Sequence, residues 1–247
     1  MKSTSSDLDS PNTTLERVQI IQKKKFLKRT YEDFYGIFKT YSKNLPLGKK
    51  VEIGSGAGFL KKIMPDVVTS DIMKLPNCDM VVSAEKMPFR NSTLSGIYML
   101  NTFHHIKNPK KALSEFSRCL KKGGRVIMVE PYNSLWGRFI YKNFHHEVFD
   151  PKGNWKIQGK GDLSDANGAL PWIVFVRDKK KFEKLYPSLK ILETIPHTPT
   201  RYILSGGFVY PQLVPLKFYN FSLSLEKWMS KFNKYFAMFV TIVIEKV

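Results

Sequence analysis

The chain has 247 residues, which is the length of one large domain or of one domain with a small cap. Hydrophobic residues make up 43% and aromatic residues 13%, so the composition excludes intrinsic disorder for most of the chain. The formal net charge is +19, and the excess is spread along the sequence, whereas a nucleic-acid-binding arm concentrates it in one block. A generally basic surface is compatible with anionic substrates, a membrane surface or RNA, and by itself selects none of them.

The cysteines and the apolar segments bear on the compartment. Cys78 and Cys119 have neither a paired nor a metal-binding spacing, which indicates a reducing environment without a disulfide framework. The first residues are polar and include Asp7 and Asp9, unlike a secretory signal. The apolar stretch Phe236–Ile244 spans nine residues, too few to cross a bilayer as a helix. We therefore expect a soluble, cytoplasmic protein.

In chain order, residues 1–14 are expected to form a flexible tail and residues 15–48 an N-terminal helical region. Thr13 and Glu16 have the spacing of a capping box, and apolar residues then recur every three to four positions, as on one face of a helix. The run Lys23–Lys25 is interpreted as a solvated face, with a lipid or nucleic-acid contact as the alternative.

Residues 49–131 alternate between short apolar strands and helices. Asn108 and Pro109 are typical of a helix start, and Gly123 of a helix end. The β-α-β alternation predicts an α/β fold with a doubly wound parallel sheet. The predicted strands are 50–53, 67–71, 80–82, 97–100 and 125–130.

The alternation lapses after Pro131. Residues 132–177 contain several aromatic side chains that need burial, so the segment is interpreted as an inserted cap rather than a linker. Residues 178–247 are expected to complete the sheet and to add a substrate-side segment. The elements predicted there are a helix over 178–186, a strand over 189–194, a helix over 222–232 and a last strand over 238–244.

The strongest functional signal is a glycine-rich turn between the first predicted strand and the next helix. Gly54, Gly56 and Gly58 are spaced G-x-G-x-G, unlike the G-x-G-x-x-G of dinucleotide-binding proteins, and no Lys-Ser/Thr pair follows as in a P-loop. Such a turn lets the backbone approach a ligand closely, at the edge where open α/β sheets bind cofactors. The alternative is a purely structural turn.

Asp71 ends the second predicted strand. An acidic residue at this position can accept both hydroxyls of a ribose, as in proteins that bind nucleoside-containing cofactors. The alternative is a solvated aspartate in a turn. Together, the glycine turn and Asp71 favour a nucleoside-containing cofactor.

Residues 49–131 resemble the class I S-adenosylmethionine-dependent methyltransferases, specifically the branch with a type 11 methyltransferase domain. The segments VEIGSGAGF, VVTSD, SAEKMPF, LNTFHHI and LKKGGRVIMVEP carry the resemblance in the order and spacing of that family. It implies a Rossmann-like, seven-stranded doubly wound sheet with an antiparallel C-terminal strand. It also implies S-adenosyl-L-methionine as cofactor and methyl transfer by in-line displacement.

The resemblance further implies roles for individual residues. The glycine loop contacts the methionine and ribose portions of the cofactor, and Asp71 holds the ribose. Many relatives have aspartate where this chain has Ser83 and Ser95, so the contact to the adenine amine is expected to shift to the backbone of Ala84. The implied cofactor-binding residues are Glu52, Gly54, Ser55, Gly56, Gly58, Asp71, Ile72, Ser83, Ala84 and Asn101.

Several histidines are candidates for chemistry. His104 or His105 can serve as general base for an oxygen nucleophile near neutral pH, although the FHHI segment, common in the superfamily, can also simply shape the site. His145 and His146 have no further ligands at suitable spacing, so no metal site is predicted. The candidate substrate-side residues, for which plain packing is the alternative, are His145, Asn167, Trp172 and Tyr202.

The sequence therefore predicts an enzyme that methylates a small or lipid-linked, anionic acceptor. Aromatic walls suit a flat or partly apolar molecule, and the basic balance suits phosphate or carboxylate. Peripheral membrane contact is compatible with this prediction, and DNA is not an expected partner. The alternatives are an RNA methyltransferase, which the net charge motivates, and a non-catalytic relative that keeps the cofactor site. The acceptor atom and the oligomeric state are not predicted.

Overall fold

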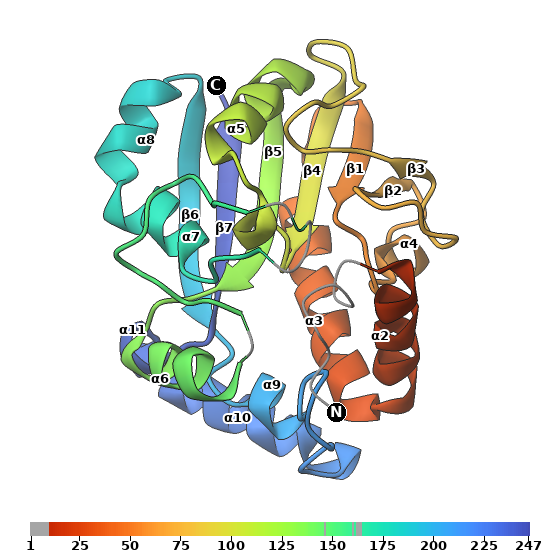
Figure 1. The fold of residues 1–247 in the computed structure, drawn as a ribbon, viewed down its shortest axis with the longest axis vertical. Coiled ribbons are helices and arrows are strands. Elements are labelled where there is room, and N and C mark those ends of the chain that lie inside the picture. The colour runs from red at the N-terminus through yellow and green to blue at the C-terminus, as the bar shows by residue number, and fades with distance from the viewer. Residues whose placement is uncertain (1–9, 146, 160, 162–164) are drawn as a thin grey trace.

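The computed structural model describes residues 10–145, 147–159, 161 and 165–247. These residues fold around a seven-stranded sheet with strand order β3-β2-β1-β4-β5-β7-β6 (Figure 1). The strands are β1 (Lys49–Ile53), β2 (Val67–Asp71), β3 (Met80–Val81), β4 (Leu94–Leu100), β5 (Leu120–Pro131), β6 (Leu189–His197) and β7 (Phe239–Lys246). The predicted α/β class is confirmed.

The sheet is parallel except at its C-terminal edge. β1 pairs in parallel with β2 and β4, β2 with β3, and β4 with β5, whereas β7 lies antiparallel between β5 and β6. The antiparallel last strand is thus confirmed. The chain order reverses between β1 and β4, and open α/β sheets bind their ligands at such a point, outside the carboxyl ends of the strands.

Helices and short helical turns flank the sheet (Figure 1). The helices are α2 (Pro11–Lys23), α3 (Lys25–Tyr41), α4 (Leu60–Ile63), α5 (Pro109–Cys119), α6 (Leu135–Phe144), α7 (Leu170–Trp172), α8 (Lys179–Leu185), α9 (Arg201–Leu204), α10 (Tyr219–Trp228) and α11 (Asn233–Phe236). The turns are η1 (Phe103–His105), η2 (Ile173–Arg177), η3 (Leu216–Phe218) and η4 (Met229–Phe232). In the described part of the chain, no helix combines the length and the hydropathy needed to cross a membrane.

The first helix begins earlier than predicted. Residues 1–9 of the expected tail lie outside the described residues, but Pro11 already starts α2. Ser10 caps this helix, because its hydroxyl accepts the backbone N–H two residues later at 3.2 Å. The assignment of residues 11–14 to a tail, with Thr13 as the cap, is therefore wrong. An N-cap serine followed by proline at the first helical position is a sufficient start signal by itself.

The hydrophobic core joins the N-terminal helices to the sheet. All seven residues of β4 are buried, as expected for a central strand covered on both faces. Phe38 of α3 packs on Tyr98 of β4, with ring centroids 5.5 Å apart, and Phe34 packs on Phe239 of β7 at 5.1 Å. The apolar stripe predicted in the N-terminal region therefore anchors α3 across the sheet.

The segment predicted as a cap contains α6, α7 and η2. In Figure 1, α6 lies with α9, α10 and α11 at one end of the molecule, the end toward which the arrow of β5 points. Elements from the cap and from the C-terminal segment thus gather where the parallel strands finish.

Candidate active site

One cavity brings most of the predicted site residues together. It lies at the carboxyl ends of β1, β2 and β4, and residues of α2, α3, α6 and α9 complete its wall. The predicted residues that line it are Glu52, Gly54, Ser55, Gly56, Gly58, Asp71, Ile72, Ser83, Ala84, Asn101, His104, His105, His145 and Tyr202. Cofactor-side and substrate-side candidates therefore face the same space.

The three positions of the turn require glycine for different physical reasons. Gly54 has φ +69°, and a Cβ there would lie 2.3 Å from a side-chain carbon of Thr102. A Cβ on Gly58 would lie 2.2 Å from the hydroxyl of Tyr35. Gly56 has φ +44°, but the nearest atom to a Cβ there would be 3.8 Å away. Gly54 and Gly58 are thus required by the protein's own packing, and Gly56 is the position that opens toward a ligand.

Asp71 ties the turn to the end of β2. Its Oδ2 accepts the backbone N–H of Gly56 at 2.9 Å, and its Oδ1 accepts that of Met73 at 3.0 Å. Each carboxylate oxygen can accept more than one hydrogen bond, so these contacts orient the group without exhausting its capacity. The arrangement suits a carboxylate that both holds the loop and accepts hydroxyl groups of a ligand.

Glu52 lies beneath the turn and is almost completely buried. The Ser55 hydroxyl donates to Oε2 of Glu52 at 2.7 Å and accepts the backbone N–H of Ser70 at 3.1 Å. Burial raises the pKa of Glu52 to about 7; the bond from Ser55 opposes this shift and the charge of Asp71 adds to it. A carboxyl group that ionises near neutral pH therefore supports the loop from below.

The end of β4 carries a backbone conformation that is uncommon outside glycine. Asn101 has φ +53°, in the left-handed region that asparagine tolerates better than most residues. Its backbone N–H donates to the carbonyl of Val129 at 2.9 Å, which holds this residue on the neighbouring strand. Its side chain interacts with the hydroxyl of Tyr31 on α3. The predicted methyl-side residue is thus positioned by both β5 and the N-terminal region.

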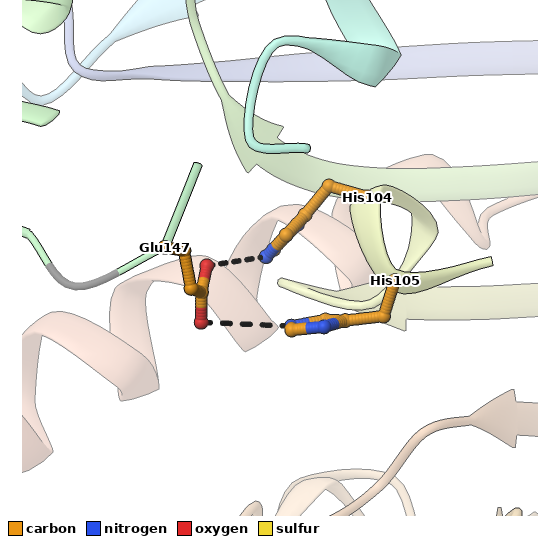
Figure 2. Close-up of side chains that lie close together, drawn as sticks. All are labelled: His104, His105 and Glu147. Carbon is orange, nitrogen blue, oxygen red and sulfur yellow. Dashed lines mark ion pairs between the residues drawn. The ribbon is translucent and has the colours of Figure 1, made fainter. Parts of the chain in front are cut away.

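A cluster of two histidines and a glutamate forms another part of the wall. Figure 2 shows His104 and His105 both pointing toward Glu147, which lies in the loop after α6. His104 Nε2 is 3.2 Å from Glu147 Oε2, and His105 Nε2 is 3.8 Å from Glu147 Oε1. On its other side, His104 Nδ1 lies 2.7 Å from Glu130 Oε2 at the end of β5. The core sheet and the cap are therefore joined through His104.

The positive charge of this cluster resides on His104. Burial alone lowers the pKa of His104, but hydrogen bonds and negative charges from Glu130 and Glu147 outweigh it and raise the pKa to about 10. Burial and the adjacent His104 lower the pKa of His105 to about 3. The two rings lie 4.2 Å apart, so one imidazolium disfavours a second. This argues against His104 as a general base and leaves His105 as the neutral imidazole.

The same cluster has donor atoms at a spacing compatible with a metal ion. One ligand atom each from His104, His105 and Glu147 lies within 4.8 Å of the others. Of the two histidines weighed as ligands from the sequence, His145 has its Nδ1 3.8 Å from Glu147 Oε2, and His146 lies outside the described residues. The ion pairs of His104 with two carboxylates already account for the close approach of these side chains.

Two predicted substrate-side residues do not line the cavity. The side-chain oxygen of Asn167 accepts the backbone N–H groups of Asp150 and Ala169 at 2.9 and 3.1 Å, and its amide donates to the carbonyl of Asp150 at 3.0 Å. Trp172 is half-buried and packs on the hydrophobic core. Both side chains hold the cap segment together, so the packing alternative describes them better.

Other lining residues carry no signal in the sequence. Arg17 of α2 places its guanidinium 5.5 Å from the ring centre of Phe208, and both line the cavity. Tyr35 is not part of any recognisable sequence motif. Its hydroxyl nevertheless accepts the backbone N–H of Phe59 at 3.1 Å and so stabilises the glycine turn. Glu147 follows the predicted histidine pair, but only the fold brings it to His104. These contacts join segments that are far apart in sequence.

Comparisons with known proteins agree with this geometry. Residues 51–128 match the family model described as "Methyltransferase domain". The match spans less than half of the chain, and these residues are similar to a methyltransferase domain. The match covers the glycine turn, Asp71 and the histidine pair, and it ends within β5.

An uncharacterised protein of Methanocaldococcus jannaschii is 30% identical to this chain over 99 residues, which are 35% of this chain and 46% of that protein. The chain thus spans less than half of this curated relative. A SAM-dependent methyltransferase from Thermotoga maritima superposes with TM-score 0.54 and 18% identity, over 96% of this chain and 100% of that one. Geranyl diphosphate C-methyltransferase from Streptomyces coelicolor gives TM-score 0.53 and 12% identity, over 90% and 80%. At these low identities the two solved structures show that the chain shares their fold, and they show nothing more.

Proposed function

We propose that this protein transfers the methyl group of S-adenosyl-L-methionine to a small or lipid-linked, anionic acceptor. The observation that carries the proposal is a single cavity lined by the glycine turn and Asp71 and also by Arg17 and the His104–Glu147 cluster. A donor pocket and an acceptor pocket that share one space are what a direct methyl transfer requires.

The residues of the donor side fit this cofactor. Gly56 opens toward the cavity, Asp71 offers carboxylate oxygens for ribose hydroxyls, and Ile72 is 44% exposed at the rim as an apolar surface for the adenine. Ser83 and Ala84 line the same side and supply polar and backbone groups for the adenine edge. The chemistry of this donor set therefore suits the ribose and the adenine of S-adenosylmethionine.

The chain's contribution to the reaction is positioning and exclusion of water. When bound, S-adenosylmethionine supplies an electrophilic methyl group, and in-line displacement forms the acceptor–carbon bond as the carbon–sulfur bond breaks. The glycine turn and Asp71 hold the donor, while the cap closes the opposite side of the cavity. Holding two reactants aligned contributes up to about 7–11 kcal/mol in favourable intramolecular models.

The acceptor side favours an anionic molecule with an apolar part. Arg17 and Lys107 line the cavity together with the carboxyl groups of Glu52, Asp71, Glu85 and Glu147, and Glu147 is paired with His104. Aromatic side chains provide the remaining wall, namely Tyr141, Phe149, Tyr202, Phe208 and Phe239. One of the structural neighbours is described as a geranyl diphosphate C-methyltransferase, and geranyl diphosphate combines an apolar chain with an anionic group. This supports the same class of acceptor here.

We assign His105 to the acceptor. Its Nδ1 is buried and has no hydrogen-bond partner among the described residues. A neutral imidazole with an unpaired nitrogen can accept a hydrogen bond from an acceptor hydroxyl or amine and orient its lone pair toward the methyl group. His104, clamped between Glu130 and Glu147, acts as a positioning residue for this ring and for the cap.

The test is methyl transfer from S-adenosylmethionine labelled in the methyl group. The purified protein is incubated with a cell extract divided into organic-soluble lipids, water-soluble metabolites and RNA. The proposal expects label in the lipid or metabolite fraction, and less of it with the Arg17→Ala variant. Label confined to RNA would support the alternative that the net charge motivates. Cofactor binding without label in any fraction would support a non-catalytic relative.

A further inference from the structure

The C-terminal helices turn an apolar stripe toward solvent. Along η3, α10, η4 and α11, exposed large apolar side chains recur every three to four positions, whereas Tyr219 is buried. Trp228 is 74% exposed and Phe221 70%. The other members of this stripe are Phe218, Leu225, Phe232, Tyr235 and Phe236. A surface helix of a globular protein normally buries such a stripe against the core, so α10 has the reverse polarity.

A buried polar network holds α10 in this orientation. Glu226, on the inner face of α10, accepts Nε of Arg201 at 2.6 Å and the backbone N–H of Arg201 at 2.7 Å. The guanidinium also donates to the hydroxyl of Tyr219 at 2.7 Å and pairs with Asp33 of α3. Rotating the helix to bury its apolar stripe would break these bonds and leave charges unpaired, which is strongly unfavourable. The polar network therefore keeps the apolar face of α10 directed toward solvent.

The charged side chains around this stripe are all basic. Between residues 209 and 236 the exposed charged residues are Lys217, Lys227, Lys231 and Lys234. The one acidic residue in that range, Glu226, is buried and paired with Arg201. Aromatic and lysine side chains interleave along one surface, which is the composition of helices that lie in the interface of an anionic bilayer.

The apolar surface extends beyond these helices. We call the exposed apolar side chains of residues 209–236 the C-terminal apolar patch. The loop before α10 adds Val209 and Leu213, which are 67% and 59% exposed. Helix α11 packs against α6, whose Leu135 and Phe139 are also more than half exposed. Figure 1 shows α6, α10 and α11 together at one end of the molecule, so these exposed apolar residues of α6 belong to the same end as the patch. Exposed apolar surface of this extent marks an interaction site.

We propose that the C-terminal apolar patch docks the protein on the surface of an anionic membrane. Among the described residues, the lysines of this segment form no ion pair, so they can complement anionic lipid headgroups, and Trp and Phe side chains suit the headgroup–acyl boundary. The stripe continues through the successive elements η3, α10, η4 and α11, so several turns of helix can contact the interface together. The helices anchor the protein to the surface without spanning it.

The C-terminal apolar patch lies near the cavity in sequence, so docking affects where the cavity lies relative to the membrane. Tyr202 on α9 and Phe208 line the cavity, and the patch begins one residue after Phe208. A docked molecule therefore brings the acceptor side of the cavity close to the lipid. This consequence, a lipid-linked acceptor taken from the membrane, rests on the proposed function, whereas the docking itself does not.

The experiment is flotation of the full chain with vesicles, without S-adenosylmethionine. Vesicles of phosphatidylcholine alone are compared with vesicles containing equal parts of phosphatidylcholine and phosphatidylglycerol. We expect binding to the anionic vesicles only, weakened by salt. Phe221→Ser with Trp228→Ser should abolish it, and Lys227→Glu with Lys231→Glu should weaken it by about tenfold or more.

Matched controls alter equally exposed residues elsewhere. Leu47→Ser with Val81→Ser changes apolar residues that are 92% and 53% exposed, and Lys179→Glu with Lys180→Glu changes two exposed lysines of α8. Both pairs should float like the unmodified protein. Circular dichroism melting checks that every variant is folded, and S-adenosylmethionine calorimetry on the same samples reports the proposed function separately.

Two results would overturn the docking proposal. One is the absence of flotation with anionic vesicles at low salt. The other is a stable dimer in light scattering that Trp228→Ser converts to monomer, with no vesicle binding, because the patch would then be an interface between copies of the chain.

Discussion

The two sides of the cavity are built in opposite ways. The cofactor side comes from the ends of adjacent strands, so Gly56 and Asp71 lie close together, and the backbone N–H of Gly56 donates to the Asp71 carboxylate. The acceptor side comes from α2, η1, the loop after α6 and α9, whose residues are far apart in the chain. Local construction preserves one binding geometry, while assembly from distant segments allows the acceptor to vary without disturbing the donor site.

The largest expected effect separates two glycines of the same turn. Gly54→Ala would place a Cβ within 2.3 Å of Thr102 at φ +69°, so we expect about 3 kcal/mol or more of destabilisation and a melting temperature lower by about 6–12 °C. Gly56→Ala meets no protein atom closer than 3.8 Å and should lower stability by only about 1 kcal/mol while reducing S-adenosylmethionine binding. Thermal melts and calorimetry of both variants test this. Equal melting temperatures would show that the turn is not packed as described.

The next effect concerns the ribose contact. Asp71→Ala should weaken S-adenosylmethionine binding by about 1–3 kcal/mol, because the hydroxyls of the ribose and the N–H of Gly56 lose their acceptor. Asp66→Ala, which removes an exposed partner of Lys50 near the start of β2, is the matched control and should bind normally. Titration calorimetry measures both. Unchanged affinity of the Asp71 variant would remove Asp71 from the site.

A third variant probes the acceptor side alone. His105→Asn should lower kcat by about tenfold to a hundredfold, because the acceptor loses its orienting partner, and should leave S-adenosylmethionine affinity unchanged. Tyr202→Phe, in the same wall, serves as a conservative comparison that keeps the cavity's shape. A loss of cofactor affinity in the His105 variant would mean that the two sides are not independent.

The smallest effect is a change in the pH dependence of stability. The pKa of Glu52 rises from 4.5 to about 7 on folding, so the protonated form favours the folded state. Relative to high pH, its stabilising contribution is complete below pH 4.5 and is lost progressively as the pH rises to about 7. Glu52→Gln should therefore melt a few degrees higher than the unmodified protein at alkaline pH. Glu193→Gln, at an exposed position, should not.

The cofactor side of the cavity was predictable from the sequence, whereas most of the acceptor side was not. The glycine turn, Asp71 and the strand alternation depend on neighbours in sequence, and each was predictable from spacing alone. The ion pair of His104 with Glu147 and the position of Arg17 depend on how α2 and the cap fold over the sheet, which no local pattern encodes. Polar cap residues illustrate the limit, since Asn167 holds backbone rather than substrate.

The polarity of α10 was also hidden in the sequence. The sequence predicts a helix over 222–232, and the structure has α10 at Tyr219–Trp228 followed by the turn η4 at Met229–Phe232. Which face is buried is decided by Arg201, whose ion pair with Glu226 draws the polar side inward. Long-range charge pairing can therefore reverse the orientation that hydrophobic periodicity suggests.

The central claim is that the Gly54–Gly58 turn binds S-adenosylmethionine in a cavity shared with the acceptor. The most direct measurement is calorimetric titration of the folded protein with S-adenosylmethionine and with S-adenosylhomocysteine. The account predicts saturable binding of both, lost in Gly56→Val, whose side chain would occupy the open space above the turn. Folded, unmodified protein that gives no binding signal with either compound would contradict it.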